Sequence, residues 1–369
     1  MNNHKLKTMT LNFTKLKFTV GWIFTLFAVV IIFPIISFAQ PSKGYIVATD
    51  YLKADGKTDI TNALQRLIDT NPNRTLFFPD GIYNISHSIL TPADPKMSVS
   101  FVLSNYACLK AIGDWKCGGA VIRLGASHPT KDITEAGSNY QFTGGIVDGA
   151  DKADGISIDG GRETRISDVS IKHTRIGIHI KYGANNGSSD ADIMNVNIVG
   201  DNHKDAIGVL VEGFDNTLTN MRIAAVNTGV WLKSGGNSLR NVHPLFIFGD
   251  SQDYLSSCGF HIERSDNFLY YCYGDQMATA FQIDKGVSAT ITDCFCFWYT
   301  DKGEVQTAIS CDGPFESLVF GLKAIFHRDA KKITLLKAEV GGKGHLVFPF
   351  IGNRNLSKSD VSSYYIFYH

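Results

Sequence analysis

Side chains able to bind a sugar recur at one position of a repeated phrase: a glycine, an apolar residue, a variable residue and a second apolar residue. The variable position is His179, Trp231 and His261 in three of the repeats. An aromatic face can stack on a pyranose ring, and imidazoles exchange hydrogen bonds with sugar hydroxyls. These residues predict a carbohydrate-binding strip. The alternative is that a loop or the C-terminal segment covers this row of residues.

A second row, two positions further along each repeat, consists entirely of ionisable residues. Its members are Asp159, Lys181, Glu212, Lys233, Glu263, Asp284 and Asp312. Opposite charges on neighbouring repeats can form a solvated ladder of ion pairs, each of which stabilises a fold little. Glu263 beside Asp284 differs, because adjacent like charges are more common in functional sites than on plain surfaces. We therefore add Lys233 and Glu263 to the residues expected to bind substrate.

Two carboxylates are placed for glycoside hydrolysis. That reaction uses a carboxylic acid and a carboxylate, about 6.5–9.5 Å apart when the sugar is inverted. Asp154 and Asp205 stand just before the repeated phrase in repeats that are two apart. Since stacked strands lie about 4.8 Å apart, these two backbones would lie roughly 9.6 Å apart. The spacing is compatible with a catalytic pair.

Lyase chemistry requires instead a base that removes the proton alpha to a uronate carboxylate, and cations that stabilise the resulting charge. The basic side chains that can serve are Arg175, Lys181, Lys204 and Lys233. His203 belongs, with Lys204 and Asp205, to the densest polar group near the strip. The candidate catalytic residues are therefore Asp154, Arg175, His203 and Asp205. Acidic loop residues such as Asp190 and Asp192 can bind calcium, although no residue is assigned to a metal.

The phrase itself repeats with the period of a solenoid. It begins at Gly155, Gly177, Gly208, Gly229 and Gly259, and variants with alanine begin at Ala280 and Ala308. In a solenoid each coil buries its apolar face only by stacking on its neighbours. Because side chains alternate along a strand, the apolar positions point inward and the variable position points outward. A second recurring phrase, first seen at 166–171, indicates at least two strands in each coil.

A helix is predicted before the first coil. Ile60, Ala63, Leu64, Leu67 and Ile68 follow a helical period. Thr58 or Asp59 can accept hydrogen bonds from the free N–H groups at its start. A short helix at this place covers the otherwise open end of the apolar core.

The segment from Ala54 to Gln65, with the segment from Leu76 to Tyr83, resembles the opening of the pectate lyase superfamily. The two read Ala-Asp-Gly-Lys-Thr-Asp-Ile-Thr-Asn-Ala-Leu-Gln and Leu-Phe-Phe-Pro-Asp-Gly-Ile-Tyr. More narrowly, they resemble its rhamnogalacturonase/epimerase-like pectate lyase domain, over roughly residues 45–320. The resemblance implies a single-stranded right-handed parallel β-helix and work on acidic polysaccharides. It is weaker for the reaction than for the fold, because the opening phrase carries no chemistry.

The polygalacturonase branch of that superfamily carries Asn-Thr-Asp-Gly, Asp-Asp, Gly-His-Gly and Arg-Ile-Lys on successive coils. This chain has Lys-Ala-Asp-Gly at 152–155, Arg-Ile at 175–176, Ala-Ile-Gly at 206–208 and Trp-Leu-Lys at 231–233. Of the carboxylates, only Asp154 carries over. Polygalacturonase activity of the usual kind is therefore not expected.

The N-terminus, residues 1–39, is predicted to be a signal peptide. An apolar stretch from Val20 to Phe38 follows several lysines, and Ser37-Phe38-Ala39 fits a cleavage site before Gln40. The alternative is an uncleaved membrane anchor. Both place the body outside the cytoplasm, secreted or in the periplasm or cell envelope.

Composition excludes some partners. The 369 residues include 35 basic and 35 acidic ones, and no dense basic patch occurs, so a nucleic-acid partner is not expected. The chain has seven cysteines. Cys108 and Cys117 lie close enough in sequence to bridge, whereas Cys272 and Cys294 occupy equivalent apolar positions and are expected to be buried thiols.

We expect an all-β chain, with a capped parallel β-helix over residues 40–320 and a β-rich C-terminal cap over 321–369. The leading hypothesis is an exported enzyme that cleaves a uronate-containing polysaccharide by lyase or hydrolase chemistry, with calcium only in the lyase case. The second hypothesis is a non-catalytic β-helix that binds glycans or serves as an envelope scaffold. The sequence specifies no oligomeric state.

Overall fold

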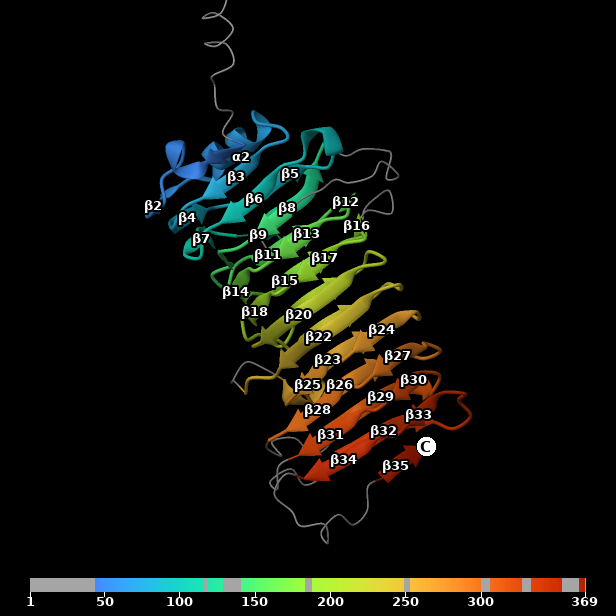
Figure 1. Cartoon of the computed structure of the whole chain (residues 1–369). Coiled ribbons are helices and arrows are strands. Elements are labelled where there is room, and N and C mark those ends of the chain that lie inside the picture. The colour runs from blue at the N-terminus through green and yellow to red at the C-terminus, as the bar shows by residue number, and fades with distance from the viewer. Residues whose placement is uncertain are drawn as a thin grey trace, which may run out of the picture. The chain divides into compact units, whose positions relative to one another are not determined.

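The computed structural model describes residues 44–115, 119–128, 141–182, 188–248, 253–299, 306–326, 333–353 and 365–368. The chain divides into two units, Met1–Tyr45 and Ile46–His369. The predicted signal peptide lies outside the described residues. The second unit is a stack of coils that runs from blue to red in Figure 1.

The described strands form three parallel sheets. The large sheet, here sheet 1, has 22 of them. They are β1 (Tyr45–Val47), β2 (Asp55–Asp59), β3 (Thr75–Phe78), β4 (Gly81–Ile85), β6 (Ser100–Leu103), β7 (Ala107–Ala111), β9 (Gln141–Thr143), β10 (Ile146–Asp148), β13 (Arg165–Ser167), β14 (Ser170–Thr174), β17 (Asp192–Met194), β18 (Asn197–Gly200), β20 (Thr217–Ala224), β22 (Ser238–Leu245), β24 (Asn267–Tyr270), β25 (Tyr273–Asp275), β27 (Ala289–Thr292), β28 (Phe295–Trp298), β30 (Leu318–Phe320), β31 (Lys323–Phe326), β33 (His345–Val347) and β34 (Phe350–Asn353).

Sheet 2 carries the repeated phrase and has 11 strands within the described ranges. They are β5 (Ile89–Pro92), β8 (Ala120–Ser127), β11 (Asp154–Ile158), β15 (Ile176–Ile180), β19 (Ile207–Val211), β21 (Thr228–Leu232), β23 (Cys258–Ile262), β26 (Thr279–Ile283), β29 (Gln306–Pro314), β32 (Ile333–Glu339) and β35 (Tyr365–Tyr368). The third sheet pairs β12 (Gly161–Arg162) with β16 (Ser188–Ser189). The helical elements are α2 (Thr61–Asp69) and the 3-10 turns η2 (Ala48–Asp50), η3 (Pro95–Met97) and η4 (Tyr254–Ser256).

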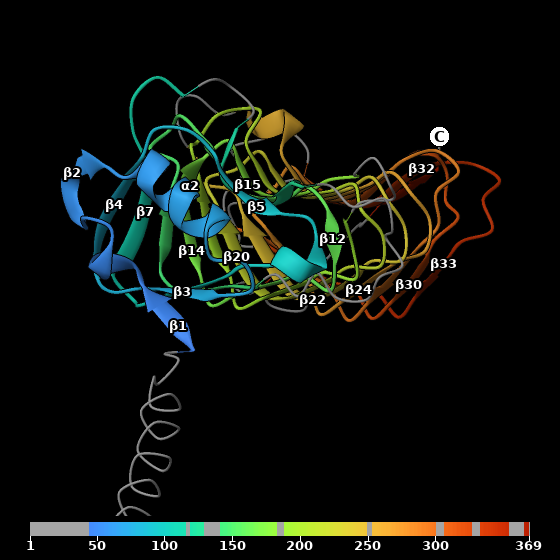
Figure 2. The same cartoon turned by 90° about the horizontal axis from the view of Figure 1, so that it is seen from above.

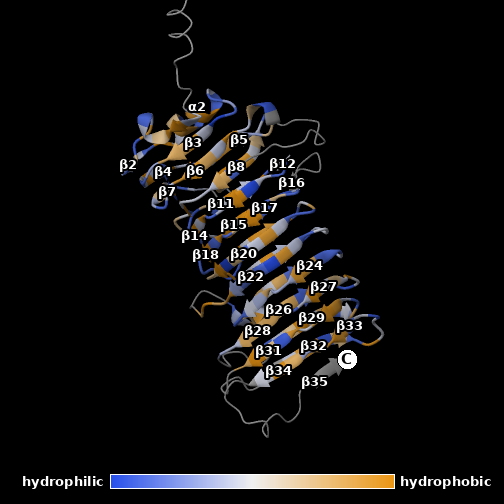
Figure 3. Cartoon of the chain, in the orientation of Figure 1, coloured by the Kyte–Doolittle hydropathy of each residue, from blue (hydrophilic) through white to orange (hydrophobic). Residues whose placement is uncertain are grey.

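The predicted inward positions of the phrase form continuous apolar rows. Ile156 lies opposite Ile178, and the row continues from coil to coil through Val209 and Val230 to Phe260. All five are at most 1% exposed. Hydrophobic and hydrophilic residues alternate along the strands in Figure 3, as expected for strands with one face on the core. The parallel β-helix with its alternating faces is therefore confirmed.

The glycine of the phrase is required by the approach of the next coil. A Cβ at Gly177 would lie 2.6 Å from the carbonyl oxygen of Gly208, and one at Gly208 would lie 2.5 Å from that of Gly229. Real Cβ atoms do not come that close to backbone, so a larger residue would push neighbouring coils apart. The repeat of glycine thus reflects the close stacking of one strand on the next.

The predicted capping helix is α2, and it lies at the N-terminal end of the coil stack (Figures 1 and 2). Leu64, Leu67 and Ile68 are buried in the core, whereas Ala63 faces solvent. Asp59 accepts a hydrogen bond from the Thr61 N–H, as predicted for the start of the helix. Gln65 both donates to the Leu90 carbonyl and accepts from the Leu90 N–H. That amide therefore replaces a neighbouring strand at the open edge of β5.

A buried asparagine ladder joins the two sheets where the sheet 2 strands end. Asn216, Asn237 and Asn267 are each fully buried. The Nδ2 of Asn216 donates to Oδ1 of Asn237 at 2.9 Å, and that of Asn237 donates to Oδ1 of Asn267 at 2.9 Å. Each amide also satisfies backbone groups of its turn. The ladder holds successive turns in register.

The described part of 321–369 extends the same coils. β31 pairs in parallel with β34, and β32 pairs with β29 and β35. Cys272 and Cys294 are buried as predicted, and burial raises the pKa of Cys294 well above its usual value. Cys117, the predicted partner of Cys108, lies outside the described residues.

Candidate functional site

The outward row of sheet 2, here the strip, runs in the predicted order. His179, Leu210, Trp231, His261 and Gln282 lie opposite one another on consecutive strands. Leu210 is buried, while the other four are half-buried. The structure thus brings together the predicted binding residues His179, Trp231 and His261 on one face.

Each polar side chain of the strip contacts the ionisable residue one coil further on. Nε2 of His179 lies 2.9 Å from Oε2 of Glu212, and Nε1 of Trp231 donates to Oε1 of Glu263 at 2.8 Å. Nε2 of His261 lies 2.9 Å from Oδ1 of Asp284. This diagonal pattern orients the carboxylates, so the two predicted rows form a single network.

The N-terminal half of the network is balanced in charge. Glu212 contacts His179 and also Lys233, whose Nζ lies 3.4 Å from Oε1. Burial by itself would raise the pKa of Glu212, but these two partners outweigh it and hold the pKa below its usual value. Asp159 follows the same rule, since its pKa is lowered by Arg123 and Lys181 against the effect of burial. Here the predicted ladder of ion pairs is what the structure contains.

The C-terminal half is not balanced. Within the described ranges, Glu263, Asp284 and Asp312 form no ion pair with a lysine or arginine, and their hydrogen-bond donors are Trp231, His261 and Gln282. One ligand atom each of His261, Glu263 and Asp284 lies within 4.8 Å of the other two. These three residues, here the acidic centre, are the strongest candidates for chemistry on the strip.

Trp231, the predicted sugar platform, makes two contacts through its ring. Its ring stacks on that of His261, with centroids 5.0 Å apart and planes at 17°. Nζ of Lys233 lies over the same ring, 5.2 Å from the centroid, and reaches toward Glu212 on the preceding coil. His261 comes from the next coil, whereas Lys233 follows Trp231 on the same coil. These contacts and the hydrogen bond to Glu263 hold the indole beside both Glu263 and His261.

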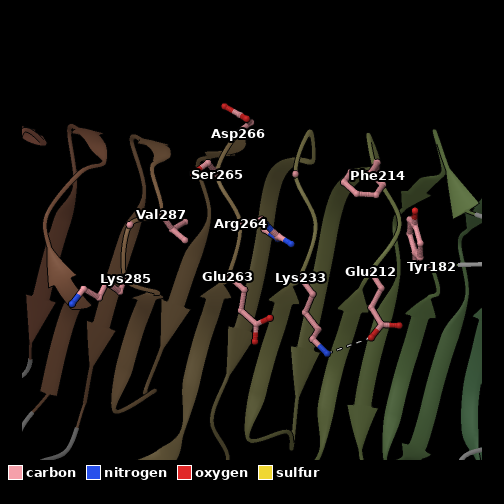
Figure 4. Close-up of a pocket in the computed structure, with 12 residues that line it drawn as sticks. Tyr182, Glu212, Phe214, Lys233, Glu263, Arg264, Ser265, Asp266, Lys285 and Val287 are labelled. Carbon is pink, nitrogen blue, oxygen red and sulfur yellow. Dashed lines mark hydrogen bonds and ion pairs between the residues drawn. The ribbon is translucent and has the colours of Figure 1, made fainter. Parts of the chain in front are cut away.

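An open cavity of about 960 Å³, here the groove, lies where the strands of the strip end. Figure 4 shows Glu212, Lys233 and Glu263 on successive coils, with Arg264 beside them. The lining residues are Tyr182, Glu212, Phe214, Lys233, Gly235, Glu263, Arg264, Ser265, Asp266, Lys285, Gly286 and Val287. A second cavity of about 490 Å³ includes His261, Gln282, Asp284 and Asp312. The acidic centre thus contributes to both cavities.

The predicted catalytic residues lie elsewhere, at the starts of β11, β15 and β19. Asp154 is 8% exposed, and its Oδ1 accepts a hydrogen bond from the Ile176 N–H at 3.0 Å. Arg175 pairs with Asp201 at 2.7 Å. Asp205 is exposed and lies 3.5 Å from His203. None of the predicted four lines either of the two cavities described above.

The burial of Asp154 leads to a testable prediction about stability. Burial raises its pKa, against the lowering effects of the Ile176 N–H and of His179. Above the pKa of the folded state, the ionised and buried carboxylate therefore lowers the free energy of unfolding. This loss disappears as the pH falls through that pKa, because the carboxyl group becomes neutral. We expect Asp154→Asn to raise the unfolding midpoint by roughly 2 °C at pH 7, for a gain of about 1 kcal/mol. The difference should close towards pH 3 in thermal scans, and a variant less stable than wild type at pH 7 would contradict it.

Sequence reasoning missed Arg264 and Lys285, which line the groove and form no ion pair among the described residues. Each lies two residues after the end of a strip strand. The sequence argument used the alternation of side chains along strands, which makes no prediction for residues in turns. Asp284 stood in the predicted ionisable row but was not chosen as a site residue. Asp190, named as an acidic loop residue able to bind calcium, pairs with Arg162 at 2.7 Å. None of the described helices has the length and hydropathy to cross a membrane.

No protein-family model matches the chain, and no curated protein has a detectably similar sequence. Several solved structures are similar in fold. A double mutant of the tailspike of E. coli bacteriophage HK620 matches 84% of this chain and 63% of its own, at 13% identity and a TM-score of 0.62. An alginate lyase from Paenibacillus sp. FPU-7 matches 75% and 95%, at 15% identity and a TM-score of 0.55.

A third is an endo-xylogalacturonan hydrolase from Aspergillus tubingensis, which matches 82% of this chain and 92% of its own, at 14% identity and a TM-score of 0.56. The chain spans less than two thirds of the tailspike, and 66% of the length of a similar protein, ORF18 of Geobacillus virus E2. At such identities the likeness shows the fold alone. The chain is therefore a right-handed parallel β-helix protein, with the fold that its resemblance to the pectate lyase superfamily implies.

Proposed function

We propose that this protein binds a polysaccharide in the groove and cleaves it at the acidic centre. The observation that carries the proposal is the pair of carboxylates Glu263 and Asp284. One oxygen of each lies within 4.8 Å of one oxygen of the other, and no lysine or arginine pairs with them in the described structure. Both are held by neutral or imidazole donors on a rigid parallel sheet. A pair so placed can divide the roles of acid and base.

Hydrolysis is the reaction that this geometry supports best. Retaining glycosidases hold their two carboxyl groups about 5–5.5 Å apart, and inverting ones hold them about 6.5–9.5 Å apart. One oxygen of Glu263 lies within 4.8 Å of one oxygen of Asp284, which is closer than the range for inverting enzymes. One carboxylate attacks the sugar while the other, protonated, donates to the leaving oxygen. His261 contacts Asp284 and Trp231 donates to Glu263, so each has a positioning partner.

Uronate units are the proposed substrate class. Arg264 and Lys285 line the groove and form no ion pair within the described parts of the chain. A guanidinium and an ammonium in these positions can receive the carboxylates of an acidic sugar. Two structural neighbours are named for cleaving polysaccharides, one as a lyase and one as a hydrolase. The predicted signal peptide would place the protein where such polymers occur.

Lyase chemistry is a second candidate, because Lys233 and Arg264 flank Glu263 in the groove. Its usual calcium ion would be held by the acidic centre. Calcium takes six to eight oxygen ligands, and an imidazole nitrogen is a poor substitute. The acidic centre therefore fits calcium poorly, and no step of the proposed reaction depends on a metal.

Binding without cleavage is a third candidate. It is favoured because the predicted catalytic residues Asp154 and Arg175 are already bound to protein groups. Asp154 and Arg175 are each held by protein groups at the edge of sheet 2. On this alternative, the groove holds a glycan and the acidic centre only aligns it.

Incubation with polygalacturonate, alginate and xylogalacturonan separates the three. We expect new reducing ends without an ultraviolet-absorbing unsaturated product, and no change of rate on addition of EDTA. An unsaturated product identifies a lyase, and retention on an immobilised polymer without turnover identifies a binding protein. If the protein neither cleaves nor retains any of these polymers, the proposal is refuted.

Trp231→Phe tests the internal arrangement of the site. It keeps a ring against His261 but removes the N–H that holds Glu263. We expect kcat to fall about tenfold with KM changed by less than twofold, as for an interaction made in the transition state. A raised KM at constant kcat would instead identify Trp231 as a sugar platform. Trp231→Ala should be worse than Trp231→Phe in kcat, since it also frees His261.

A further inference from the structure

A further hollow, of about 320 Å³, lies on sheet 1 and is separate from the groove. Its lining residues are Asn220, Arg240, Asn241, Tyr270 and Tyr271, here the tyrosine face. They come from or directly follow β20, β22 and β24, which are consecutive strands in Figure 1. None of them lines the groove or contacts the acidic centre.

The tyrosine face begins where a ladder of exposed asparagines is interrupted. Asn195, Asn220 and Asn241 occupy equivalent positions on three consecutive coils, with φ of 56°, 54° and 53°. Nδ2 of Asn220 donates to Asn195 at 3.3 Å, and Nδ2 of Asn241 donates to Asn220 at 3.0 Å. Asparagine is the non-glycine residue best suited to this left-handed conformation. On the next coil the equivalent residue is Tyr271, with φ of 54°.

Tyr271 gains little from burial to offset its conformation. A bulky residue in the left-handed region costs on the order of 1 kcal/mol or more. Its side chain is 62% exposed, and that of Tyr270 is 44% exposed. The tyrosine therefore stands at a position where asparagine would stabilise the fold better. A strained and exposed aromatic residue is a reason to look for a ligand.

The interruption also leaves polar groups open beside the two rings. Oδ1 of Asn241 has no hydrogen-bond partner in the described structure, since the next coil offers no asparagine amide. Arg240 lies opposite Tyr270 in the sheet, with its guanidinium carbon 5.6 Å from the ring centroid. No carboxylate among the described residues pairs with Arg240. The tyrosine face thus combines two aromatic rings, an amide acceptor and a positive charge without a counterion.

We propose that the tyrosine face is a second glycan-binding site, specific for an acidic sugar unit. A tyrosine ring stacks on the pyranose, and Asn241 accepts a hydrogen bond from a hydroxyl. Arg240 pairs with the sugar carboxylate through its planar fork of donors. The charge of Arg240 selects an acidic sugar over a neutral one. A second site strengthens the retention of a long polymer and leaves the cleavage of a short oligosaccharide unchanged.

The test compares the wild type with a double variant, Arg240→Gln with Tyr271→Asn, by affinity electrophoresis. The gels contain polygalacturonate or alginate, and dextran is the neutral control. Tyr271→Asn restores the residue of the three preceding coils, so we expect an unfolding midpoint at least equal to that of wild type. Retention by the acidic polymers should fall about fivefold or more, equal to about 1 kcal/mol of binding free energy, and migration in dextran should not change.

Several results would overturn this proposal. They are unchanged retention of the double variant, an equal loss on dextran, or a wild type that neither acidic polymer retains. A wild type that self-associates in sedimentation, and a double variant that does not, would show instead that the tyrosine face joins copies of the chain. Because Glu263→Gln disables the acidic centre and leaves the tyrosine face intact, its retention separates failure of cleavage from failure of this site.

Discussion

Glu263→Gln is expected to lower kcat on the cleaved polysaccharide by about 10³-fold, the order that general acid–base catalysis contributes. The amide keeps the size of the side chain and can still accept from the Trp231 N–H, but it can neither attack nor transfer a proton. KM should change little, since the groove keeps its shape. Asp284→Asn should cause a loss of the same order. The double variant should be scarcely worse than either, because the two groups act as a unit.

The matched control is Asp312→Asn, one coil beyond Asp284 and likewise hydrogen-bonded to a strip residue, Gln282. It should lose less than about tenfold in kcat, since the carboxylate is outside the acidic centre. Loss of activity in Asp312→Asn with little effect of Asp284→Asn would contradict the proposed pair and indicate a wider, inverting one. The configuration of the released sugar, followed by NMR, gives an independent answer.

Asn237→Ala is expected to lower the free energy of unfolding by about 3 kcal/mol, because a buried hydrogen-bond network loses its centre. The side chain of Asn237 accepts from the N–H and Nδ2 of Asn216 and donates to Asn267 and to the Ser234 carbonyl. All of these groups lie in the interior. Urea unfolding measures the loss.

The control for this variant is Asn220→Gly in the exposed asparagine ladder. Glycine accepts the left-handed backbone there, and the lost hydrogen bonds are replaced by water, so the change should stay within about 0.5 kcal/mol. Equal losses in the two variants would mean that burial is not what makes the inner ladder stabilising. Since the turns held by Asn237 and Asn267 carry Gly235, Arg264 and Asp266 of the groove, Asn237→Ala should also weaken substrate binding.

The coils, their register and the outward rows could be predicted from the repeated phrase. Gly177 and Gly208 recur because a Cβ would meet the next coil, and Ile156 and Ile178 recur because both face the core. A parallel solenoid places equivalent residues side by side, so alignment of the repeats is already a map of neighbours. The capping helix α2 was predicted for a similar local reason, an apolar period next to a start signal.

The contacts within the rows could not be predicted in this way. Alternation places Trp231 and Glu263 on one face, but it does not show that the indole donates to that carboxylate, that His261 stacks on its ring or that Lys233 lies over it. Nor does it distinguish Glu212, which is balanced by two basic partners, from Glu263, which has none among the described residues. These differences depend on rotamers that lean toward one neighbouring coil or the other.

The sequence by itself determined which residues share a coil, which share a row and which face the solvent, because those properties follow from the stacking period alone. Only the tertiary structure decided which carboxylates remain without a cation, that Asp154 and Arg175 are engaged away from the groove, and that Arg264 and Lys285 enter it from turns. The physical reason is that a side chain's charge balance and burial depend on groups brought by other coils and their turns, and turns obey no alternation.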